Sequence, residues 1–174
     1  MAEQRERLLI AKYLQERYPH HQKQTNVPLG LPAPQLIAEF GLQTALRIGI
    51  KMRPNVDAIV WDKPNLILIE AKIVRWVDGI AKLPFYEALF LDTPELQQWF
   101  DWPRKLVLVI PYTQENMLNV ARRMGVEVVE YSTPEIDDYL QNQLPYYQTG
   151  DYKRKRRELL DTQEALGVRT FDGM

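Results

Sequence analysis

Residues 57–72 of the chain read Asp57-Ala-Ile-Val-Trp-Asp-Lys-Pro-Asn-Leu-Ile-Leu-Ile-Glu-Ala-Lys72. Two runs rich in aliphatic, β-branched and aromatic residues flank the segment Asp62–Asn65, which has a typical turn composition. The pattern predicts a β-hairpin with its turn at that segment. Because the two runs are almost continuously hydrophobic, we expect strands that are covered on both faces.

The charged side chains outside the turn fall at one end of this predicted hairpin. If the four residues after Trp61 form the turn, Trp61 pairs with Leu66. Counting back then places Asp57 opposite Glu70, with Cβ atoms about 4.5–5.5 Å apart on a shared face. Lys72 follows Glu70 by two residues and therefore projects to the same face. We expect two carboxylates and one ammonium to converge there.

The rest of the chain predicts an α/β sandwich with a small mixed sheet flanked by helices. Residues 19–34 hold four prolines and are interpreted as a loop or a short edge strand. We expect this α/β core to span residues 1–132, and the more polar residues 133–174 to form a helical extension that serves as an interaction segment. Helices are predicted at 3–18, 35–40, 78–91 and 113–124, and further strands at 104–110 and 126–131.

Composition excludes several kinds of chemistry. The 174 residues contain no cysteine, one serine, and two histidines that are adjacent, His20 and His21. A disulfide framework, a thiolate zinc site and a cysteine nucleophile are therefore ruled out, and most nucleophile–histidine enzymes are disfavoured. No apolar run approaches the roughly 20 residues that cross a bilayer, so we expect a cytoplasmic protein without a membrane partner.

The net charge is −1, with 22 basic against 23 acidic side chains. Proteins that hold duplex DNA usually present a basic face, because counterion release dominates their affinity. Any nucleic-acid role must therefore rest on a local basic patch.

A divalent cation would resolve the conflict between the two opposed carboxylates. Like charges placed directly opposite each other destabilise a strand pair, and Mg²⁺ favours one or two carboxylates together with water and phosphate oxygens. Such a site supports phosphodiester hydrolysis without histidine, serine or cysteine, and Lys72 could orient or deprotonate the attacking water or offset transition-state charge. The alternative is a structural ion pair between Lys72 and Glu70 or Asp57.

The stretches Arg53-Pro-Asn-Val-Asp57, Glu70-Ala-Lys72 and Asp78–Tyr86 resemble the PD-(D/E)xK nuclease superfamily, which includes restriction enzymes, Holliday-junction resolvases and phage exonucleases. The resemblance implies a restriction-endonuclease-like fold in which Asp57 and Glu70 hold Mg²⁺ or Mn²⁺ and Lys72 serves the attacking water. Family members often carry a Gln-x-x-x-Tyr pattern on the following helix. Here Lys82 takes the place of the glutamine and Tyr86 matches the tyrosine.

Further candidates surround this motif. The family often adds a metal contact from a first-helix glutamate, for which Glu6 is the best match, although we interpret it as a solvated acid at the helix terminus. The two histidines are interpreted as exposed loop residues, and the basic run 153–157 as a solvated, internally paired helix. Candidates for nucleic-acid contact are Arg75, Trp76, Lys82 and Tyr86, with core packing as the alternative for Trp76.

Two functional hypotheses remain. The first is a metal-dependent DNA nuclease. The second is a catalytically inactive nuclease-fold protein that builds a larger complex such as a phage virion, as a homo-oligomer or hetero-assembly through residues 133–174. The near-neutral charge and Lys82 favour the second hypothesis.

Overall fold

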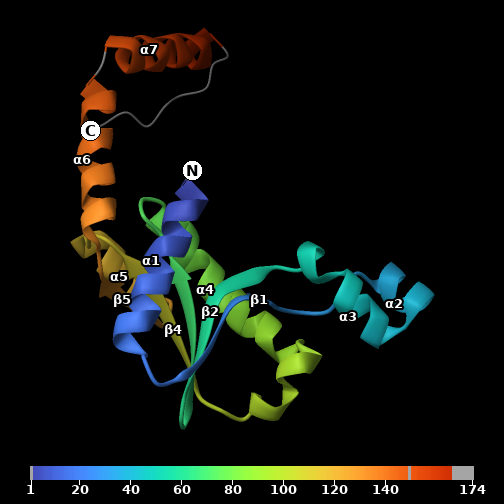
Figure 1. Cartoon of the computed structure of the whole chain (residues 1–174). Helices are drawn as coiled ribbons and strands as arrows, with labels where there is room; N and C mark the ends of the chain where they lie inside the picture. The colour runs from blue at the N-terminus through green and yellow to red at the C-terminus, as the bar shows by residue number, and fades with distance from the viewer. Residues whose placement is uncertain (1, 149, 166–174) are drawn as a thin grey trace. The chain divides into compact units, whose positions relative to one another are not determined.

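The computed structural model describes residues 2–148 and 150–165 (Figure 1). Within these residues the strands form one five-stranded sheet in the order β1-β2-β3-β4-β5. The first three strands are antiparallel, and β3, β4 and β5 run parallel. The predicted α/β class with a small mixed sheet flanked by helices is therefore confirmed. The strands are β1 (Gln22–Pro28), β2 (Asn55–Asp62), β3 (Asn65–Ala71), β4 (Arg104–Ile110) and β5 (Val126–Glu130).

The prediction left residues 19–34 open between a loop and an edge strand, and β1 shows that the edge strand forms. Its side chains are mostly exposed and polar, so the sequence lacks the hydrophobic alternation that would predict a strand. The sequence predicts no helix directly after Phe40, yet a second short helix forms there. The helices are α1 (Ala2–Arg17), α2 (Pro34–Phe40), α3 (Leu42–Ile48), α4 (Trp76–Leu91), α5 (Glu115–Arg123), α6 (Pro134–Gln148) and α7 (Gly150–Ala165), with 3₁₀ turns η1 (Ile50–Met52) and η2 (Pro94–Trp99).

The hairpin register agrees with the turn-based prediction. Trp61 pairs with Leu66, and the ladder runs from Asp62–Asn65 to Ala58–Ile69. Beyond β3 the chain must cross over to place β4 parallel to it, and such a connection usually contains a helix. Here α4 and η2 make that crossover, and α5 makes the next one. The crossover brings α4 directly after the end of β3 that carries Glu70.

The two faces of the sheet are covered by different helices. Leu66 and Leu68 belong to the main hydrophobic cluster, to which α4 contributes four buried side chains, Ile80, Leu83, Tyr86 and Phe90. The alternate residues Ile67 and Ile69 are also buried and must point to the other face, because successive strand residues alternate. Helix α1 contacts β2 and β3 and buries Leu9, Ile10, Tyr13 and Leu14. Both strands of the hairpin are therefore covered on both sides, as predicted.

The chain divides into two compact units, one ending at Thr133 and the other beginning at Pro134. The second unit contains α6 and α7. In α7, Arg154 and Glu158 form an ion pair of 3.9 Å at i,i+4 spacing, as predicted for a solvated helix, while residues 166–174 lie outside the described part of the chain. Among the described residues, no helix combines the length and apolar character that a membrane crossing requires.

Candidate active site

Glu70 and Lys72 meet at the end of β3. Glu70 is 1% exposed, and its Oε1 lies 2.9 Å from Lys72 Nζ. Lys72 also donates a hydrogen bond of 3.0 Å to the carbonyl of Ala71. The ion pair follows from the period of two along the chain, which puts both side chains on one face. The sequence therefore placed this pair correctly.

Asp57 lies where the β2–β3 ladder ends. The last paired residues are Ala58 and Ile69, and Asp57 and Glu70 come next on their strands. The N–H of Ala71 donates a hydrogen bond of 2.8 Å to Oδ2 of Asp57, in place of a backbone carbonyl. The sheet thus opens at this point, and a side-chain oxygen completes the hydrogen bonding that the ladder no longer supplies.

Helix α1 brings Glu6 into the same cluster. Glu6 Oε2 lies 3.2 Å from Lys72 Nζ, and the Glu6 side chain is only 22% exposed. The interpretation of Glu6 as a solvated acid is therefore wrong. The helical spacing that puts Glu6 on the face of buried Ile10 and Tyr13 is the signal that identified it as a candidate.

Helix α4 contributes Lys82 and Tyr86, which lie one turn apart. Lys82 Nζ is 3.5 Å from Glu70 Oε1, and its side chain is 48% exposed. Tyr86 is 5% exposed and belongs to the core cluster. Burial raises the pKa of the Tyr86 hydroxyl, and the charges of Glu70 and Asp57 raise it further. Lys82 therefore reaches the surface of the cluster, whereas Tyr86 lies beneath it.

Arg75 and Trp76 stand at the start of α4. The Arg75 side chain is exposed, and Trp76 is partly buried and packs against the core cluster. The core-packing alternative for Trp76 is therefore observed. Nucleic-acid contact by Arg75, Trp76, Lys82 or Tyr86 stays a prediction.

Burial and the charges of neighbouring groups shift the pKa values of Glu70 and Lys72. Burial, followed by the charge of Asp57, raises the pKa of Glu70, while Lys72 and Lys82 act in the opposite direction. For Lys72, burial by itself would lower the pKa, but the charges of Glu70, Asp57 and Glu6 outweigh it and raise the pKa.

One atom of the cluster remains without a partner. Glu70 Oε2 is buried and accepts no hydrogen bond from any described residue, although a buried charged oxygen is costly to leave unpaired. A divalent cation between Glu70 and Asp57 would satisfy it. Over residues 2–148 and 150–165, no group of three or more His, Cys, Asp or Glu side chains could hold a metal ion. The donor set fits Mg²⁺ or Mn²⁺ with two carboxylates, because such ions keep water and phosphate oxygens as their remaining ligands.

Two residues support this cluster without belonging to it. A Cβ at Gly79 of α4 would lie 2.6 Å from Leu108 Cδ1 and 3.0 Å from Lys72 Cγ, so only glycine lets α4 approach this closely. The buried Arg53 guanidinium anchors the start of β2 through bonds of 2.6 and 3.1 Å to the carboxylate of Glu95. Neither role could be predicted from the sequence, because both depend on contacts with distant segments.

The two histidines lie at the opposite end of the hairpin. Both are exposed, as predicted, and His21 Nε2 is 3.4 Å from Asp62 Oδ1 beside the turn. They take no part in the carboxylate cluster.

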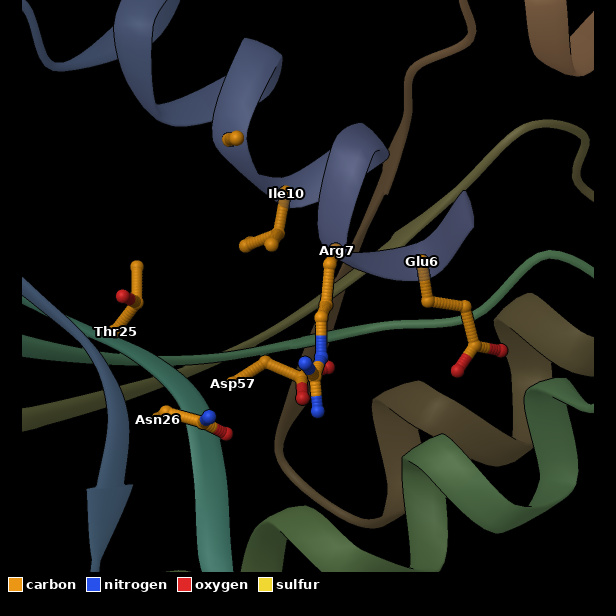
Figure 2. A pocket seen from close by; sticks show the side chains of 7 residues that line it. Glu6, Arg7, Ile10, Thr25, Asn26 and Asp57 are labelled. Atoms are coloured by element: carbon orange, nitrogen blue, oxygen red, sulfur yellow. The ribbon is translucent and has the colours of Figure 1, made fainter. Parts of the chain in front are cut away.

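A small recess opens next to Asp57, between α1 and β1, and we call it the α1–β1 recess (Figure 2). Its volume is about 200 Å³. Most of its residues could not be predicted as site residues from the sequence, because they occupy exposed positions of α1 and β1 that carry no motif. It is lined by Glu6, Arg7, Ile10, Ala11, Thr25, Asn26 and Asp57.

No protein-family model matches the chain, and no curated protein matches it. Two solved structures are similar to it at low sequence identity. A crystal structure of a protein of unknown function is 14% identical with a TM-score of 0.42, covering 75% of this chain and 59% of that one. A repair endonuclease from Pyrococcus abyssi is 18% identical with a TM-score of 0.41, covering 73% of this chain and 47% of that one.

This chain thus spans about half of the length of those two proteins. Both TM-scores are low, and the assignment of a function rests on the side chains of the site.

Proposed function

We propose that the protein is a metal-dependent nuclease that hydrolyses phosphodiester bonds in DNA, using Mg²⁺ or Mn²⁺. The observation that carries this proposal is Glu70, whose carboxylate is buried, has one unpartnered oxygen and lies beside a second carboxylate, Asp57. A protein core has no structural need for such a group, because a partnered or apolar side chain would be less costly there.

In the proposed reaction Asp57 and Glu70 hold the cation through their carboxylate oxygens. When bound, Mg²⁺ supplies positive charge that offsets the charge building up on the phosphate. The ammonium group of Lys72 lies beside Glu70 and positions the attacking water. Glu6 restrains Lys72 through the 3.2 Å contact, so that its long side chain stays within the site.

The direct test measures cleavage of linear, branched and single-stranded DNA by the purified full chain with Mg²⁺ or Mn²⁺. Lys72→Ala should lower the rate by at least about 100-fold, as expected for loss of a group that assists proton transfer or positions water. Lys105→Ala is the matched control, because Lys105 is an exposed lysine at the other end of the sheet.

A second variant guards against misfolding of Lys72→Ala. Asp57→Asn keeps an oxygen that can accept the bond from the Ala71 N–H, yet it removes one charge from the metal site, so cleavage should also be lost. Failure of the wild-type chain to cleave any of the three DNA forms with either metal would contradict the proposal. Full activity of both variants would contradict it equally.

One observation favours the second candidate function, an inactive nuclease-fold protein in a larger assembly such as a phage particle. Lys72 and Lys82 both pair with Glu70 Oε1, so much of the carboxylate charge is offset without a metal. Under this hypothesis Asp57→Ala leaves function intact, whereas a chain ending at Gln148 fails to assemble. Light scattering of the full and shortened chains measures this, and the same number of subunits in both would count against an assembly role of residues 149–174.

A further inference from the structure

The α1–β1 recess has two chemically different walls. Ile10 and Ala11 of α1 form an apolar side, while Arg7, Thr25 and Asn26 supply a guanidinium, a hydroxyl and an amide. Figure 2 shows Arg7 and Asn26 extending toward the part of the recess where Asp57 lies. An apolar wall combined with a few polar groups is the usual composition of a site for an organic ligand.

Asn26, which lines the recess, has an unusual backbone conformation. Asn26 has a φ of +57°, a left-handed conformation that asparagine tolerates better than most residues. The β1–β2 register is the same on both sides of Asn26, with the pairs Thr25–Ala58 and Val27–Val56, and this register places Asn26 opposite Asp57. Backbone strain of this kind concentrates at functional sites. The strained residue and the proposed metal ligand thus share one recess.

The two carboxylates of the lining already have partners. Glu6 pairs with Lys72 at 3.2 Å, and Asp57 accepts the N–H of Ala71 at 2.8 Å. Arg7 contributes a guanidinium to the same lining, and guanidinium groups bind phosphate oxygens well.

The volume of the recess and the access to it restrict which organic ligands can bind there. A volume of about 200 Å³ is smaller than sites for whole drug-sized molecules, which span roughly 300–1,000 Å³, and it suits one planar heterocycle. A nucleobase offers apolar faces and a hydrogen-bonding edge, which match the two walls. A base can enter such a recess only when it is unpaired and unstacked.

We propose that the α1–β1 recess binds an unpaired nucleobase next to the phosphate held at Asp57 and Glu70, so that the substrate is single-stranded or locally unpaired DNA. This inference rests on the proposed nuclease function.

The test measures binding by fluorescence anisotropy with Ca²⁺ in place of Mg²⁺ or Mn²⁺, so that a cation is present while cleavage is avoided. Three labelled probes are compared with the full chain: a short thymidine oligonucleotide, a base-free oligonucleotide of the same length, and the corresponding duplex. The wild-type chain should bind the thymidine strand about tenfold more tightly than the other two, which is the order of effect that one base contact supplies.

Three substitutions locate the effect. Ala11→Phe should fill the recess from an exposed helix position and remove most of the preference for the thymidine strand, leaving binding of the base-free strand unchanged. Gln15→Phe adds the same ring at another exposed position of α1, one turn beyond the recess, and should keep the preference. Asn26→Gly permits the positive φ but removes the amide, so it should weaken thymidine binding severalfold.

The outcomes separate the two proposals. Equal affinity for the thymidine and base-free strands, or an unchanged preference in Ala11→Phe, would overturn the base-binding recess even if Mg²⁺-dependent cleavage is observed. A preference that is lost in Ala11→Phe but kept in Gln15→Phe would support the recess. If that result came from a chain that cleaves nothing, the nuclease function would fail and base binding would stand.

Discussion

The two ends of the β2–β3 hairpin belong to the same hydrophobic strands, but one end is apolar and the other carries a cluster of charged side chains. At the turn end, Trp61 pairs with Leu66, and both side chains are buried in the core cluster. At the other end, the ladder stops at Ala58–Ile69. There the charged cluster begins at the next residue of each strand, Asp57 and Glu70, and Lys72 follows two residues later.

The difference shows where stability and chemistry are placed in this fold. The turn end gains free energy from apolar burial, at about 25 cal/mol per Å². The open end gives up ladder hydrogen bonds and keeps a buried carboxylate with an unpartnered oxygen, an arrangement that costs stability. We therefore expect substitutions at the turn end to change folding, and substitutions at the open end to change ligand binding.

The largest expected effect is at the turn end. Leu66 is fully buried, and Leu66→Ala should lower the free energy of unfolding by about 2–5 kcal/mol, because it removes apolar contacts and leaves a cavity. Urea unfolding measures the change, and Mn²⁺ affinity should stay as in the wild type under folding conditions. A loss below about 1 kcal/mol would mean that the turn end carries less of the stability than its burial indicates.

The next effect concerns the contact that joins α4 to the open end. Gly79→Ala should destabilise the protein by about 1–3 kcal/mol, because the new methyl group would overlap Leu108 and press on Lys72. In an unobstructed helix the same change would instead stabilise by roughly 0.5–1 kcal/mol, so the sign of the change in thermal unfolding decides the question. A rise in melting temperature would show that α4 does not need its close approach.

A smaller effect is expected at the rim of the charged cluster. Lys82→Gln removes a half-exposed cation 3.5 Å from Glu70 Oε1, and it should strengthen Mn²⁺ binding by about 0.2–1 kcal/mol, or roughly 1.5- to 5-fold, since the lysine competes with the metal. Titration calorimetry measures the affinity, with Lys105→Gln as the control. Weaker Mn²⁺ binding in Lys82→Gln would show that Lys82 supports the metal site.

The smallest effect is a gain in stability from the open end itself. Asp57→Asn removes one of two neighbouring negative charges while keeping an acceptor for the Ala71 N–H, so the metal-free protein should become more stable by up to about 1 kcal/mol. Urea unfolding in EDTA measures this. Destabilisation would mean that Asp57 serves mainly to hold the end of β3 in place.

Much of the fold was predictable from local pattern. The hairpin turn and the strand register followed from turn composition and from the alternation of side chains, and the ion pair between Lys72 and Glu70 followed from the same register. Strand β1 was harder to predict, because its exposed polar residues show no hydrophobic alternation. Glu6 was identified by its helical spacing, yet its contact with Lys72 depends on how α1 packs on the sheet.

The sequence by itself determined the hairpin and the face on which its carboxylates and lysine lie, because strand periodicity is strict over neighbouring residues. Only the tertiary structure decided what else reaches that face. Glu6, Arg7 and Asn26 come from α1 and β1, and Lys82 comes from α4. Their positions depend on the packing of helices on the sheet and on the pairing of β1 with β2. Those features arise from contacts between distant segments, which no local pattern encodes.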